Sequence, residues 1–249
     1  MKSNGRWRWV TDGFVIVASI LLAFWIDAWW DGVQGGRQEA ALVESVREEL
    51  EVNRESIRFF LTMGAAHLDR VDRFLRATPE QLRAMPTDSV HPMVEAMWLP
   101  PTFDAQISAT TMFLDSPPGS TSESLVSRQL VGGWSRQLAD AQEEGADLRA
   151  QASEVVDMLA AVSVTLPSPP PDPIPDWSLA DLDLQNRTFV STAIEQGGGE
   201  TLARLHADEA FVMALARKMH DQRRYNFELA RASEGLELVL AALATASAR

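Results

Sequence analysis

Histidine and carboxylate side chains are the groups of this chain that could bind a metal ion or transfer protons. The histidines are His67, His91, His206 and His220. None of them forms the i,i+4 pair of a helical metal site. His206 and His220 share a face of one predicted helix, but fourteen residues of helical rise separate them by about 21 Å. We therefore interpret the histidines as isolated polar residues and predict no metal site and no cofactor.

Carboxylates are too numerous to identify a catalytic pair. A glycoside hydrolase needs two carboxylates fixed across a cleft, and a chain with 35 acidic and 22 basic side chains offers many chance pairs. The acids alternate with arginines such as Arg136, Arg149 and Arg217, which is typical of a solvated, salt-bridged helix surface. Because the chain also has no cysteine and no G-x-S-x-G motif, we predict no catalytic residues and no enzymatic activity.

The net charge of −13 argues against a nucleic-acid partner, because an acidic domain repels phosphate backbones. No small-molecule substrate is predicted either. A group of soft and aromatic side chains in the proline-rich region 79–118 has two interpretations: an adaptable binding surface, or the filling of an irregular core. We favour the core. The group consists of Met93, Met97, Trp98, Met112 and Phe113.

The elements that position these residues begin with an apolar helix. Its centre runs from Gly13 to Ile26. Trp9 and Trp29 are separated by about 30 Å of helical rise, the thickness of the hydrocarbon core of a bilayer. The sequence therefore predicts a transmembrane helix over 13–30, with tryptophan rings at the headgroup level on both sides. The predicted interfacial residues are Trp7, Trp9, Trp25, Trp29 and Trp30.

The same segment has a second interpretation as a cleaved signal peptide. No small-x-small cleavage site follows the apolar run, so we favour a retained anchor. Basic residues such as Lys2 and Arg6 precede the helix, whereas Asp27 and Asp31 follow it. The positive-inside rule then makes residues 1–12 a cytoplasmic tail. We expect the helix in a bacterial inner membrane and the bulk of the chain in the periplasm.

One face of the predicted anchor carries small and acidic residues. Asp12, Ser19, Ala23 and Asp27 are separated by seven, four and four residues, so they share a helix face. Ser19 and Ala23 form a small-xxx-small pair, which allows another helix to approach closely. We interpret these four residues as a docking stripe for another transmembrane helix. The alternative is that both aspartates only lie at the water boundary.

A long helix follows a predicted break at residues 31–36. Apolar residues recur at seven-residue spacing from Val43 to Val71, and Phe74 keeps the same register. This spacing is typical of a helix that packs on neighbouring helices. We expect the helix to end near Thr78, before a proline.

The rest of the chain is predicted to form helices in two parts. Residues 36–165 make the first part and residues 178–249 the second, and a proline-rich linker over 166–177 joins them. The second part should end in one helix from Glu200 to about Thr245, whose apolar end packs within the bundle. The other expected helices are Glu80–Met85, Val90–Trp98, Phe103–Leu114 and a long helix that ends near Val164. No window alternates over the length of a strand, so the fold class is all-α, with one N-terminal transmembrane helix before an extracytoplasmic bundle.

The segment Val15–Trp30 contains the pattern I-L-x-A-F-x-I-(N/D)-x-W, and a helix rich in Glu and Arg follows from Arg37 to Asn53. Residues 15–76 thereby resemble a group of bacterial single-pass inner-membrane proteins to which no activity is assigned. The resemblance implies the same topology, an N-terminal anchor with a helical periplasmic domain. It transfers no catalytic residue.

These observations favour a non-catalytic accessory subunit that braces or helps assemble a larger membrane protein complex, for example a photosynthetic or respiratory complex. The expected partners are the membrane and other integral membrane subunits. The alternative is a periplasmic ligand-sensing bundle that signals through another membrane protein. We favour it less, because the expected cytoplasmic tail is too short for an output domain. An envelope enzyme is a third alternative, for which no catalytic motif was found.

Overall fold

The structure is a computed structural model that describes the backbone of residues 4–117, 122–161 and 198–247. At the ends of these ranges, and throughout residues 4–17, the side chains are not described. The described residues form helices and no strand, which confirms the all-α prediction. The predicted proline-rich linker and the first residues of the second helical part lie outside the described residues.

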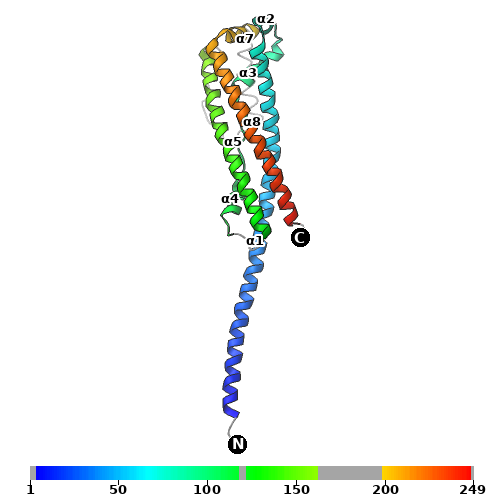
Figure 1. The fold of residues 1–249 in the computed structure, drawn as a ribbon, viewed down its shortest axis with the longest axis vertical. Helices are drawn as coiled ribbons and strands as arrows, with labels where there is room; N and C mark the ends of the chain where they lie inside the picture. The colour runs from blue at the N-terminus through cyan, green and yellow to red at the C-terminus, as the bar shows by residue number, and fades with distance from the viewer. Residues whose placement is uncertain (1–3, 118–121, 162–197, 248–249) are drawn as a thin grey trace, which may run out of the picture.

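The described helices differ greatly in length. They are α1 (Asn4–Arg76), α2 (Pro79–Arg83), α3 (Thr87–Trp98), α4 (Ser108–Asp115), α5 (Ser122–Ala161), α7 (Gly198–Ala207) and α8 (Glu209–Ser247). The long helices α1, α5 and α8 run side by side and define an elongated bundle (Figure 1). The short helices α3 and α4 each contact both α1 and α5. At the end of the bundle away from the N-terminus, α2 and α7 pack on each other (Figure 1).

The helix α1 is continuous, so the predicted break at residues 31–36 is wrong. Gly32, Gly35 and Gly36 all lie inside the helix. A glycine in a helix interior destabilises the helix by only about 1 kcal/mol relative to alanine. Because helix formation is cooperative, the stability of the flanking turns offsets this loss. No proline interrupts this stretch of the sequence. The predicted anchor and the first helix of the bundle therefore form a single rod.

The heptad pattern predicted for the later part of α1 is confirmed by burial. Val46, Leu50, Ile57, Val71 and Phe74 are all buried. Their spacing of three and four residues places them on the stripe of α1 that faces the rest of the bundle. The first three belong to a core shared with α5 and α8, and the last two belong to a second core that includes α3 and α7.

Side-chain caps explain where helix boundaries fall. Thr78 and Gln81 form a reciprocal capping box that starts α2 directly after the end of α1. The single helix predicted from Glu200 onward is wrong, because the chain breaks at Asp208. The carboxylate of Asp208 accepts hydrogen bonds from the backbone N atoms of Ala210 and Phe211, at 2.9 and 3.2 Å, and so begins α8.

The apolar end of α8 is buried within the bundle, as predicted. Leu236, Val239 and Leu243 contribute to the core shared with α1 and α5.

Met93 and Met97 of α3 are also buried. This confirms for these two residues, and for the buried Phe113, that the soft and aromatic side chains of the proline-rich region fill a core. The interpretation is wrong for Met112, which is 62% exposed on α4.

Among the residues whose side chains the structure describes, no helix combines the length and the apolar character needed to cross a membrane. The predicted span begins at Gly13, and its side chains before Ala18 lie outside that part of the chain. The side chains of Trp7, Trp9 and Asp12 lie outside it as well.

Candidate functional sites

The beginning of α1 projects alone from the bundle (Figure 1). We call residues 18–35 of this projection the N-terminal rod. Its large apolar side chains are 47–67% exposed. They are Ile20, Leu21, Leu22, Phe24, Trp25, Ile26, Trp29 and Trp30. At 3.6 residues per turn, so many nearly consecutive positions cover most of the helix surface and leave one narrow face, which carries Ala23 and Asp27.

The docking stripe lies on this rod. Ser19, Ala23 and Asp27 are exposed, and their four-residue spacing on a continuous helix places them on one face. Asp12 keeps the same register on α1, although its side chain lies outside the described part. The stripe therefore has the predicted arrangement along the described backbone, and its docking role stays a prediction.

Residues 99–107 form an irregular segment between α3 and α4, which we call the strap; the sequence predicted a helix from Phe103 here, and that prediction is wrong up to Ile107. Backbone N–H and C=O groups that leave helical geometry inside a bundle need other partners, and side chains of α1 supply several. Asn53 Nδ2 donates to Gln106 O at 2.7 Å, and Gln106 N donates to Asn53 Oδ1 at 3.0 Å. The carboxylate of Glu49 accepts bonds of 2.7 and 3.0 Å from two backbone N–H groups at the start of α4.

Two buried residues of α8 hold the other end of the strap. Phe103 N donates to the hydroxyl oxygen of Tyr225 at 2.6 Å. Lys218 Nζ donates to Ala96 O at 3.0 Å and to Leu99 O at 3.4 Å. Burial raises the pKa of Tyr225 to about 12 and lowers the pKa of Lys218 to about 8. Both shifts disfavour the charged form. The phenol of Tyr225 therefore stays neutral, and the two carbonyl groups stabilise the charged ammonium of Lys218 by accepting its hydrogen bonds.

His67 of α1 lies beside the same strap and is held in its neutral form. Burial, with the charges of Lys218 and Arg70 as smaller causes, lowers the pKa of His67 to about 4, and the carbonyl of Leu99 opposes this shift. Its Nδ1 atom has no hydrogen-bond partner among the described residues. The described residues also contain no group of three side chains arranged to hold a metal ion. We call the following residues the strap clamp: Glu49, Asn53, His67, Lys218 and Tyr225.

Sequence reasoning missed the strap clamp, although one signal for it was present. Asn53 and His67 keep the seven-residue register of Val46, Phe60 and Phe74, and so occupy core positions of the heptad. A polar residue at such a position needs a buried partner. Here the partner is irregular backbone, so the clamp orders the chain and presents no reactive pair.

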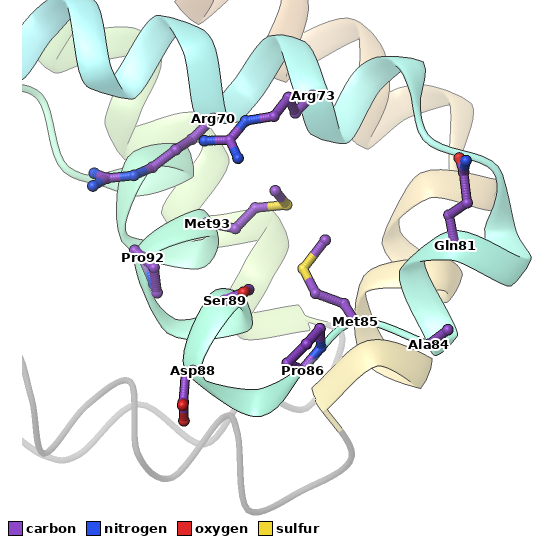
Figure 2. Close-up of a pocket in the computed structure, with 10 residues that line it drawn as sticks. All are labelled: Arg70, Arg73, Gln81, Ala84, Met85, Pro86, Asp88, Ser89, Pro92 and Met93. Carbon is purple, nitrogen blue, oxygen red and sulfur yellow. The ribbon is translucent and has the colours of Figure 1, made fainter.

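A pocket of about 390 Å³ opens where the end of α1 meets α2 and α3 (Figure 2). We call it the arginine pocket, because Arg70 and Arg73 of α1 line one side of it. Met85 and Met93 line the space opposite, and their side chains extend toward each other (Figure 2). Sequence reasoning did not connect these arginines with the methionines, because only the fold brings α1 against α3.

The chain matches no protein family, no curated protein and no solved structure with which it was compared. The resemblance of residues 15–76 to bacterial inner-membrane proteins stays a prediction. Function is therefore inferred from the N-terminal rod, the strap clamp and the arginine pocket themselves.

Proposed function

We propose that this protein is a non-catalytic, single-pass membrane-anchored accessory subunit that braces or helps assemble a larger membrane protein complex. The observation that carries the proposal is the exposure of large apolar side chains around most of the circumference of the N-terminal rod. Removing one such side chain from water is worth roughly 1.5–3 kcal/mol, and eight of them occur between Ile20 and Trp30. A rod with this surface needs an apolar environment that its own bundle does not provide.

A bilayer supplies that environment to a helix that projects alone. All backbone hydrogen bonds of a helix are internal, so it can enter lipid without leaving polar groups unpaired. Trp29 and Trp30 end the apolar stretch, where tryptophan rings suit the headgroup level. In this proposal the span covers residues 13–30 of an inner membrane, residues 1–12 are cytoplasmic, and the bundle is periplasmic.

The docking stripe supports a partner within the membrane. Ser19 and Ala23 keep one face of the rod narrow, so a second helix can approach its backbone closely. The N-terminal rod and the first helix of the bundle are parts of one continuous helix, α1. A contact that the rod makes in the membrane would therefore also set the position of the bundle outside it. That coupling suits a bracing subunit.

A second candidate is a periplasmic ligand-sensing bundle that signals through another membrane protein. The arginine pocket favours it, since a pocket lined by α1 is connected to the N-terminal rod through one continuous helix. Ligand-dependent change in the proteins bound by the rod would favour this candidate over a constitutive brace.

The test is purification of the full-length protein from native membranes in mild detergent, with mass spectrometry of the proteins that accompany it. We expect the protein in the membrane fraction together with other integral membrane subunits. Recovery in the soluble fraction would contradict the anchor. Recovery from membranes as an isolated monomer would contradict the role as an accessory subunit.

A pair of matched variants tests the docking stripe. Ser19→Leu with Ala23→Leu should reduce co-purification without releasing the protein from the membrane, because the added bulk keeps a second helix away. Ala18→Leu with Ala28→Leu adds the same bulk to other faces of the rod and should leave the partners bound. If the stripe variant retains its partners, the contact belongs to the bundle instead.

A further inference from the structure

We propose that the arginine pocket binds a free anionic amphiphile, a molecule with one carboxylate or phosphate head and an apolar body. Its volume of about 390 Å³ lies within the range of small-molecule sites. The lining has two parts that match the two parts of such a molecule. Guanidinium groups of α1 lie on one side, and thioether and proline side chains, among them Pro86, lie on the other.

Arg70 and Arg73 are both available to a negatively charged head. Arg70 makes no ion pair with any described residue. Arg73 pairs with Asp69 at 2.8 Å between Nη2 and Oδ2, but the two side chains are 62% and 66% exposed. An exposed pair of this kind is weak because water screens it, whereas a carboxylate or phosphate gains charge-assisted bonds from a guanidinium fork. The head can therefore compete with Asp69 for Arg73, and no described acidic side chain competes for Arg70.

Met85 and Met93 suit the apolar body of the ligand. Met93 lines the pocket and is only 5% exposed, while Met85 is more exposed. Flexible thioether side chains adapt to irregular apolar shapes. Asp88 also belongs to the lining, but its carboxylate points away from both methionines (Figure 2). Asp88 therefore does not approach the two sulfur atoms, and the acidic group next to the arginines is Asp69, which pairs with Arg73.

The ligand is a free molecule rather than a bilayer lipid, and this part of the inference rests on the proposed membrane anchor. Arg73 lies about 66 Å beyond Trp29 along the axis of α1, at 1.5 Å of rise per residue. A lipid headgroup at the level of Trp29 does not reach that far. The pocket is thus placed for a solute that arrives from the aqueous side.

The test uses the full-length protein with ¹³C-methyl methionine in nanodiscs of zwitterionic lipid, studied by NMR. Hexyl phosphate and hexanoate should shift the methyl signals of Met85 and Met93 in a saturable way. Hexyltrimethylammonium, with the same chain and opposite charge, should not. Met112, which is 62% exposed on α4, provides an internal control and should not respond to any of the three compounds.

Matched arginine variants test the role of the charges. Arg70→Gln with Arg73→Gln should weaken the binding of hexyl phosphate at least about tenfold, since a charge-assisted hydrogen bond is worth more than the roughly 1.4 kcal/mol of a tenfold change. Arg47→Gln with Arg76→Gln removes two arginines of α1 outside the pocket and should leave binding unchanged. The methionine spectrum of each variant shows whether the fold is retained.

Several outcomes would overturn the inference. They are the absence of a shift at Met85 and Met93, an equal response to the cationic compound, an equal response of Met112, or unchanged binding in the Arg70 and Arg73 variant. Shifts caused by anionic lipid in the nanodisc without any added compound would overturn the choice of a free ligand. Membrane fractionation tests the anchor separately, so the two proposals can fail independently.

Discussion

Acidification should destabilise this protein through one buried histidine. In the folded protein the pKa of His67 is lowered from 6.5 to about 4, first by burial and then by the charges of Lys218 and Arg70. In the unfolded chain the ring meets water and regains its ordinary pKa. Between these two values the unfolded chain binds a proton that the folded protein does not, so the free energy of unfolding falls as the pH falls.

The size of the effect follows from the two pKa values of His67. The difference between 6.5 and about 4, at roughly 1.4 kcal/mol for each pH unit, corresponds to about 3 kcal/mol. The loss begins as the pH drops below about 6.5 and is complete near pH 4. Carboxylates elsewhere in this acidic chain also titrate at the lower end of that range, so the contribution of the histidine must be measured by difference.

The assay is urea unfolding of the full-length protein, followed by circular dichroism from pH 7 to pH 4. The variant His67→Gln keeps a polar side chain beside the strap but does not titrate. The free energy of unfolding of the wild type should fall by about 3 kcal/mol more than that of the variant over this range. His220→Gln replaces an exposed histidine of α8 and should follow the wild type.

Parallel pH profiles of the wild type and His67→Gln would refute the reasoning. They would mean that the ring of His67 is solvated in the folded protein, or that the strap moves to accept the charged form. A steeper loss in the variant would refute it as well, because the sign of the linkage would then be reversed.

Three further changes test the packing around the strap, the far end of the bundle and a glycine position inside α1. Tyr225→Phe should cost about 1–3 kcal/mol in the free energy of unfolding, measured by urea titration, because it leaves the backbone N–H of Phe103 buried without its partner; an unchanged midpoint would show that this N–H reaches water. Gly199→Ala should destabilise by about 1–3 kcal/mol, since its Cβ would lie 2.7 Å from the carbonyl oxygen of Arg83, which is backbone that cannot move aside cheaply. Gly36→Ala meets nothing within 4 Å and should instead raise the melting temperature slightly, through helix propensity worth up to about 1 kcal/mol; a loss of stability there would indicate that α1 needs a flexible point.

The sequence alone determined the fold class and the buried face of α1. Periodicity carries this information directly, because residues such as Leu50, Ile57 and Val71 repeat at the spacing of a helix face. The sequence likewise indicated that the apolar end of α8 is covered by the bundle, because burying residues such as Leu236 and Leu243 removes their apolar surface from water. These are properties of local pattern and apolar area.

The sequence was misleading where small free energies decide the outcome. Gly32, Gly35 and Gly36 suggested a break, but their combined cost is small against the cooperativity of a 73-residue helix. Asp208 was one acid among 35 in the sequence, and only its position one residue before α8 made it a cap. The residue types in a short stretch of sequence do not show whether a glycine breaks a helix or whether an aspartate caps one.

Only the tertiary structure decided how the strap is held and where the arginine pocket lies. Asn53 finds its partners in Gln106, 53 positions away, and Lys218 finds one in Ala96, 122 positions away. A polar residue at a core position indicates that a buried hydrogen-bond partner is needed. The tertiary fold decides which chain segment supplies that partner. Hydrogen bonds and charge pairs act over a few ångströms in space, and the sequence does not encode that proximity in local spacing.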